Sequence, residues 1–147
     1  MKLAQIQMHV TADKAANLRH AEDLLRSVRG TDMAILPEMF CCPYDNACFR
    51  AYGEPEGGPA YQMLSRAARE LNLWLVGGSL PELDGDNIYN TAYVFDPTGT
   101  CVARHRKMHL FDIDVEGGQR FMESEVLSPG REVTTFLSLI HISEPTR

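Results

Sequence analysis

The first third of the chain has hydrophobic patterns that predict a strand, a helix and a second strand. Residues 3–10 form a short apolar run, and residues 11–13 offer the hydroxyl and carboxylate side chains that cap helices. From Lys14 the apolar positions recur at helical spacing, and Gly30 closes the element. Residues 32–38 have the continuous apolar character of a buried strand, so we expect them to lie inside a sheet.

The middle of the chain predicts a loop, a second helix, a strand and a hairpin. Prolines and glycines prevent a long helix over residues 39–59, whereas residues 61–71 place apolar side chains on one helical face. Residues 73–81 are typical of a buried strand that leads into a glycine-rich turn. Since no Lys-Ser or Lys-Thr pair follows those glycines, the spacing excludes a nucleotide P-loop. The alternating residues 90–95, an Asp-Pro-Thr-Gly turn and the apolar residues 101–103 predict a hairpin.

The order of these elements predicts an α/β fold with helices against one face of a mixed sheet. A last strand is expected over residues 131–136. With 147 residues, a net charge of −6 and 44% hydrophobic residues, the chain is typical of one acidic globular domain or a piece of one.

Composition also excludes two classes of partner. An acidic chain without a basic stripe lacks the electrostatic footprint of nucleic-acid-binding proteins, so we expect no nucleic-acid partner. No apolar run reaches the roughly 20 residues that span a bilayer, and the N-terminus begins a strand rather than a signal peptide. We therefore expect no membrane partner and a cytoplasmic location.

The four cysteines, Cys41, Cys42, Cys48 and Cys101, form neither a C-x-x-C pair nor the usual spacing of zinc ligands. We expect free thiols that act as small buried hydrophobic side chains. One alternative is a zinc site of the first three cysteines and a histidine. Another is a nucleophilic cysteine, for which the local sequence supplies no base.

The most unusual stretch is residues 104–118, where three cations and a histidine end the predicted hairpin and an acidic loop closed by glycines follows. Lys107 falls where the sheet ends, and loops at such points often carry functional side chains. Glu38 falls at the carboxyl end of a buried strand, where open α/β sheets bind their ligands. The alternative interpretation of the charged stretch is a solvated strand end with its counter-ions.

Several motifs occur together in the order typical of the nitrilase superfamily of carbon–nitrogen hydrolases, which the chain resembles over about residues 3–136. Residues 36–38 match its glutamate motif and residues 106–110 its lysine motif. Within the superfamily the chain is most similar to the omega-amidase branch. The other matching segments are Gly77-Gly78-Ser79-Leu80-Pro81-Glu82, Tyr89-Asn90-Thr91, Phe95-Asp96-Pro97-Thr98-Gly99, Leu110-Phe111-Asp112-Ile113-Asp114-Val115, Phe121, Glu123-Ser124 and Leu127-Ser128-Pro129-Gly130.

This resemblance implies a fold and a mechanism. Residues 1–136 would be a partial carbon–nitrogen hydrolase domain, the amino-terminal half of a four-layer αββα sandwich. Glu38 would be the general base, Lys107 the cation that stabilises an oxyanion, and Glu123 a second glutamate that positions substrate and the other catalytic groups. The reaction would hydrolyse the terminal amide of small dicarboxylic acid monoamides through a cysteine thioester, without a metal or organic cofactor. The partner would be a small-molecule amide, and the full-length protein a homodimer.

The nucleophile is the point of departure from the family. Its cysteine lies about forty residues after the lysine, on a strand-to-helix turn, which would fall beyond Arg147. None of the four cysteines matches that position, so we expect the chain as written to be inactive. The alternatives are another amidase of the superfamily, an N-carbamoyl amidase, or a non-enzymatic dimerisation module.

Residues 137–147 lack capping residues and do not continue the pattern of the preceding strand. The peptide corresponds codon for codon to a transposase adapter used in sequencing libraries. We therefore expect read-through into adapter after Phe136, and we exclude this tail, His141 included, from the fold and from any site.

Overall fold

The computed structural model describes residues 1–138. The expected strand 131–136 is wrong, because this segment forms no strand; the adapter hypothesis concerns residues 137–147, most of which lie outside the described range. The elements are β1 (Leu3–Gln5), α1 (Lys14–Ser27), β2 (Met33–Ile35), α2 (Asn46–Tyr52), α3 (Pro59–Leu71), β3 (Trp74–Val76), β4 (Leu80–Asp84), β5 (Asn87–Phe95), β6 (Cys101–Arg106), β7 (Asp112–Asp114), β8 (Arg120–Met122) and the 3₁₀ turn η1 (Glu123–Glu125).

The sheet is mixed, as the sequence predicts, and residues 1–138 supply six strands to it. β1, β2 and β3 are parallel neighbours, and β3 continues to β5 in the antiparallel sense. β5 is the longest strand: it pairs with β3 and β4 along one edge and with β6 along the other. The predicted hairpin is therefore β5 and β6. Asn90 of β5 contacts the residues that follow both β2 and β6, Glu38 and Lys107.

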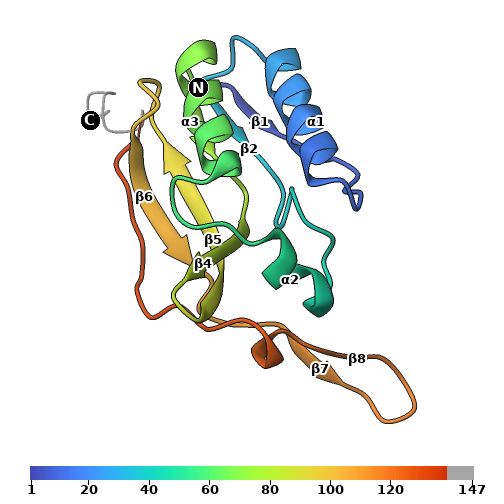
Figure 1. Cartoon of the computed structure of the whole chain (residues 1–147). Coiled ribbons are helices and arrows are strands. Elements are labelled where there is room, and N and C mark those ends of the chain that lie inside the picture. The colour runs from blue at the N-terminus through green and yellow to red at the C-terminus, as the bar shows by residue number, and fades with distance from the viewer. Residues whose placement is uncertain (139–147) are drawn as a thin grey trace.

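The two long helices, α1 and α3, lie side by side on one face of the sheet (Figure 1). Asp13 caps α1 by accepting a hydrogen bond from the Ala16 amide at 2.9 Å, as its position before the helix predicts. α3 begins with Pro59, and its free amides donate to the carboxylate of Glu54 rather than to the preceding residue. Its apolar face packs on the sheet through Tyr61. The Tyr61 ring lies edge to face against Tyr93 and Phe95, with ring centroids 5.1 and 4.9 Å apart.

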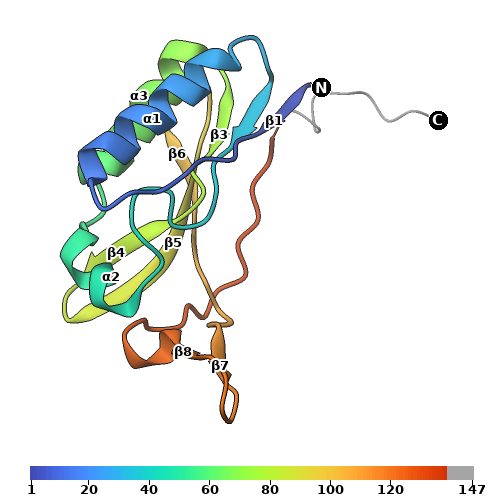
Figure 2. The same ribbon diagram turned by 90° about the vertical axis from the view of Figure 1, so that its right-hand side faces the viewer.

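The other face of the sheet carries no helix among the described residues, and the last described segment runs along it (Figure 2). There Thr134 donates to the Arg104 carbonyl at 3.1 Å, and Phe136 stacks on Trp74. This arrangement, with helices on one side only, agrees with half of a layered αββα sandwich. The segment makes side-chain contacts instead of a backbone ladder, so it is not a strand.

The predicted strand 73–81 is instead two strands, β3 and β4, separated by the glycine turn, and β4 forms a second hairpin with β5.

Other elements occur where the sequence predicts only loops. The short helix α2 lies inside the predicted loop 39–59, capped by Asp45 through the Ala47 amide. The acidic stretch after Lys107 folds into the hairpin of β7 and β8, which projects from the body (Figure 1). None of the helices within residues 1–138 is long and apolar enough to cross a membrane.

Candidate functional site

Glu38 is presented by a sharp turn directly after β2. The next residue, Met39, is buried and has a left-handed backbone with φ 50°, and its amide donates to the Ser79 hydroxyl at 3.1 Å. Gly78 lies across the turn with φ 56°, and a Cβ there would fall 2.0 Å from the Pro37 carbonyl oxygen. The glycine-rich motif is thus needed for the close approach of two backbones that aims Glu38 off the sheet.

Lys107 follows β6 immediately, and two backbone hydrogen bonds hold it. Its amide donates to the Asn90 carbonyl at 2.8 Å, and its carbonyl accepts from the Gly130 amide at 2.9 Å. Its ammonium lies 2.9 Å from Glu38 Oε1 and 3.0 Å from Glu123 Oε2. The structure therefore brings together the three residues that the sequence nominates, from positions up to 85 residues apart in sequence.

Glu123 is completely buried at the start of η1. Its Oε1 accepts from the Tyr44 hydroxyl at 2.5 Å, while Oε2 accepts from the Phe111 amide and faces Lys107. A buried carboxylate is stable only when its charge is paired and its oxygens are hydrogen-bonded, and these three donors meet that need. With its oxygens so occupied, Glu123 is suited to holding other groups in place rather than to exchanging protons.

Glu38 has the opposite surroundings. Its side chain is 50% exposed, and Oε1 accepts from Asn90 Nδ2 at 2.8 Å as well as from Lys107. Among residues 1–138 no hydrogen bond reaches Oε2. One carboxylate oxygen is thus oriented by two donors while the other stays open to a ligand, which is the geometry that a general base requires.

The ammonium between these carboxylates stays charged. Burial alone would lower the pKa of Lys107, but the hydrogen bonds to Glu38 and Glu123 outweigh it and raise the pKa above its ordinary value. A hollow of about 300 Å³ opens beside the ammonium. It is lined by Glu38, Gly78, Ser79, Asn90, Ala92, His105 and Lys107. A small molecule in this hollow would meet a fixed cation and a free carboxylate oxygen.

Sequence reasoning missed Tyr44 as a site residue. It lies in the loop before α2, and its hydroxyl is 3.4 Å from Lys107 Nζ in addition to its bond to Glu123. Burial, and then the hydrogen bond to Glu123, raise its pKa, so the hydroxyl stays protonated and donates. No local pattern distinguishes this tyrosine, because its partners come from β6 and η1.

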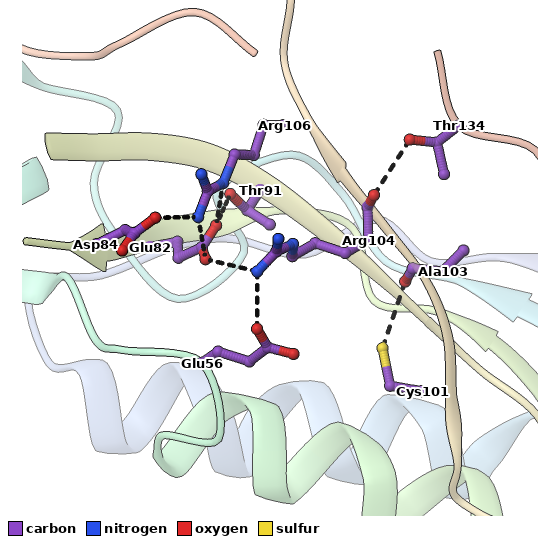
Figure 3. Close-up of polar contacts among 9 residues, drawn as sticks. All are labelled: Glu56, Glu82, Asp84, Thr91, Cys101, Ala103, Arg104, Arg106 and Thr134. Carbon is purple, nitrogen blue, oxygen red and sulfur yellow. Dashed lines mark hydrogen bonds and ion pairs between the residues drawn. The ribbon is translucent and has the colours of Figure 1, made fainter. Parts of the chain in front are cut away.

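A second charged cluster holds the strand that carries Lys107 (Figure 3). Arg106 donates to both oxygens of Glu82, at 2.9 and 2.7 Å, and also reaches Asp84 at 2.8 Å. Glu82 is 2% exposed and accepts a further bond from Thr91 at 2.6 Å. This bidentate pair ties β4, β5 and β6 together one residue before Lys107, so it fixes the strand end from which the ammonium extends.

The cysteines fit the expectation of inert thiols in part. Cys41 and Cys42 are buried, and burial raises the pKa of each thiol to about 12. Cys48 and Cys101 are partly exposed, and all four are free. Within residues 1–138 no group of three His, Cys, Asp or Glu side chains could hold a metal ion, so the zinc alternative finds no support in this part of the chain.

Comparison with known proteins matches residues 2–141 to the carbon-nitrogen hydrolase family model. Among curated relatives, the zebrafish (Danio rerio) omega-amidase NIT2 is 47% identical over 137 residues, which cover 92% of this chain and 50% of the relative. The human omega-amidase NIT2 is 43% identical with the same coverage. The chain therefore spans about half the length of the curated relatives it matches.

The fold agrees with these matches. Nit3 of Saccharomyces cerevisiae, a member of branch 10 of the nitrilase superfamily, superposes with a TM-score of 0.77 at 36% identity. The superposition covers 90% of this chain and 49% of that one. The α/β sheet with helices on one face thus corresponds to half of a nitrilase-superfamily fold.

Proposed function

The chain belongs to the carbon–nitrogen hydrolase family, and from this premise we propose that it supplies the two-glutamate and lysine part of an amidase active site. The observation that carries the proposal is the placement of the Lys107 ammonium 2.9 Å from Glu38 and 3.0 Å from Glu123 at the edge of an open hollow. Whole relatives are about twice as long as this chain, so the complete reaction is proposed for the full-length protein.

The proposed reaction is cysteine-based amide hydrolysis. The cysteine thiol attacks the amide carbonyl as Glu38 takes its proton, and Lys107 stabilises the negative charge that develops on the carbonyl oxygen. Glu38 then gives the proton to the departing ammonia, which leaves a thioester. The same carboxylate takes a proton from water as the oxygen attacks the thioester, and then returns that proton to the departing thiolate as the carboxylic acid is released. Glu123 holds the ammonium in place throughout.

The thiol is proposed to come from the part of the relatives' length that this chain does not span. Cys41 and Cys42 are buried with raised pKa values, whereas a nucleophilic cysteine needs an accessible thiolate. Cys101 lies at the start of β6, at the opposite end of that strand from Lys107. We therefore expect the 147-residue chain alone to release no ammonia from amides.

The proposed substrates are small dicarboxylic acid monoamides such as alpha-ketoglutaramate or succinamate. The support is the match to several proteins named omega-amidase at 43 to 47% identity. The full-length protein is further proposed to act as a cytoplasmic homodimer; a monomer in sizing chromatography would contradict the dimer.

The test is ammonia release by the full-length gene product. We expect higher kcat/KM on the monoamides than on N-carbamoyl amino acids or nitriles; a preference for either of the latter would overturn the substrate assignment. Resequencing the gene across the codon for Phe136 with an adapter-free library belongs to the same test. A frame that continues into a cysteine on a strand-to-helix turn supports the mechanism, whereas genomic codons for residues 137–147 followed by a stop would favour a non-enzymatic module.

A further inference from the structure

We propose that Tyr44 is a positioning residue that keeps Lys107 shared between the two glutamates. The inference rests on the proposed amidase function of the site. Among residues 1–138, Tyr44 forms no hydrogen bond to Glu38. Its hydrogen bonds go to Glu123 and Lys107, and Tyr44 is not among the residues that line the hollow, so it acts through the groups that do the chemistry.

The Tyr44 hydroxyl has one proton, so it can donate only one hydrogen bond, and the geometry identifies the acceptor. Tyr44 donates to Glu123 Oε1 at 2.5 Å, so the oxygen remains free to accept from the Lys107 ammonium at 3.4 Å. Glu123 Oε1 has no other donor among the described residues. By donating a hydrogen bond to Glu123, the tyrosine thus weakens the electrostatic attraction between the Glu123 carboxylate and the Lys107 ammonium.

The ring is held independently of these hydrogen bonds. Tyr44 packs edge to face on Phe49 of α2 at 5.7 Å and against Phe121 of β8 at 5.5 Å. The neighbouring Asn46 donates to the Met122 carbonyl at 2.8 Å, which ties the same loop to the same strand. Because aromatic contacts and a backbone link fix the loop, removal of the hydroxyl should leave the ring in place.

Loss of the hydroxyl would redistribute the hydrogen bonds of the ammonium. Glu123 Oε1 would be buried without a donor, and the Lys107 ammonium, 3.0 Å from Oε2 of the same carboxylate, is placed to turn toward it. Each bond that Lys107 gives to Glu123 weakens its bond to Glu38. The ammonium would then lie deeper and further from a developing oxyanion, while the outer part of the hollow stays unchanged.

The test is Tyr44→Phe in the full-length protein, with Tyr52→Phe as matched control. Tyr52 is in the adjoining helix, and its hydroxyl donates to the Ala12 carbonyl at 2.5 Å, away from the cluster. We expect Tyr44→Phe to lower kcat by about ten- to a hundred-fold, the usual effect of one hydrogen bond to a buried charge, with KM within about threefold. Tyr52→Phe should leave both constants near those of the wild type.

A crystal structure of Tyr44→Phe gives a readout that does not depend on the substrate. The separation between Lys107 Nζ and Glu38 Oε1 should lengthen beyond about 3.5 Å, outside direct hydrogen bonding. An unchanged separation together with an unchanged kcat would overturn the role of Tyr44, as would a rise in KM alone. If the wild type prefers another carbon–nitrogen substrate, the substrate assignment fails while the same comparison of variants on that substrate still decides the role of Tyr44.

Discussion

Arg106 and Lys107 are neighbours in the chain, yet they enter two different clusters of carboxylates. Arg106 occupies both oxygens of Glu82, a residue that is 2% exposed and also receives a bond from Thr91. Lys107 is shared between Glu123, which is buried and fully hydrogen-bonded, and Glu38, which keeps one oxygen open. In the first cluster, which we call closed, both oxygens of the central carboxylate accept hydrogen bonds. In the second, which we call open, Glu38 Oε2 is left for a ligand.

This difference in hydrogen bonding distinguishes an ion pair that stabilises the fold from one that is suited to catalysis. A guanidinium stays charged under all ordinary conditions and its planar fork matches a carboxylate, so the Arg106 and Glu82 pair is suited to joining strands. An ammonium is a compact point charge that can approach a ligand oxygen, and a half-exposed carboxylate beside it can exchange protons with that ligand. Variants of each cluster should accordingly affect different measurements.

The largest effect is expected from Lys107→Met in the full-length protein. Removing the cation that would face the oxyanion should lower kcat by about 10³-fold or more, since loss of even one neutral oxyanion donor costs 10²- to 10³-fold. Steady-state rates of ammonia release measure this. The matched control is Arg104→Gln, which removes a 43% exposed cation from the same strand and should leave kcat unchanged. Near-normal turnover by Lys107→Met would refute its proposed role.

A large loss of stability is expected from Glu82→Leu. The change leaves Arg106 with only the exposed Asp84 as partner and should lower the free energy of unfolding by about 3 kcal/mol. The double variant Glu82→Leu, Arg106→Leu should recover part of this loss because no buried charge remains unpaired. Urea unfolding measures both. Arg26→Gln, a 51% exposed cation of α1 that pairs with Glu22 and Glu70, should cost less than about 1 kcal/mol.

The smallest effect is a pH dependence of the closed cluster. Burial tends to raise the pKa of Glu82, but the hydrogen bonds from Arg106 and Thr91 outweigh it and hold the pKa below the ordinary value of 4.5. A carboxyl whose folded pKa is depressed stabilises the fold above its unfolded pKa and loses that contribution as pH falls through the folded one. The difference in unfolding free energy between wild type and Glu82→Leu should therefore be constant from pH 7 to about 4.5 and shrink below. A difference that widens on acidification would contradict this assignment.

The main elements of the fold follow from local patterns. The helical spacing after Lys14, the capping position of Asp13 and the Asp-Pro-Thr-Gly turn each act within a few residues, so α1, α3 and the hairpin of β5 and β6 could be predicted. Two segments were predicted wrongly, each for its own reason. The segment 131–136 contacts Arg104 and Trp74 through side chains and forms no backbone ladder. The hairpin of β7 and β8 is short and mostly exposed, so burial leaves little pattern in it.

The candidate site, like the fold, could be predicted from the sequence only in part. Glu38, Lys107 and Glu123 could be nominated because family motifs mark them, and their roles stay predictions. What the sequence by itself determined is which residue types stand at the ends of strands, since periodicity and turn chemistry are local. Only the tertiary structure decided that Tyr44 meets Glu123 across 79 residues and that adjacent cations serve separate clusters. Such contacts depend on sheet order and on burial, which bring distant residues together without leaving a repeating pattern in the chain.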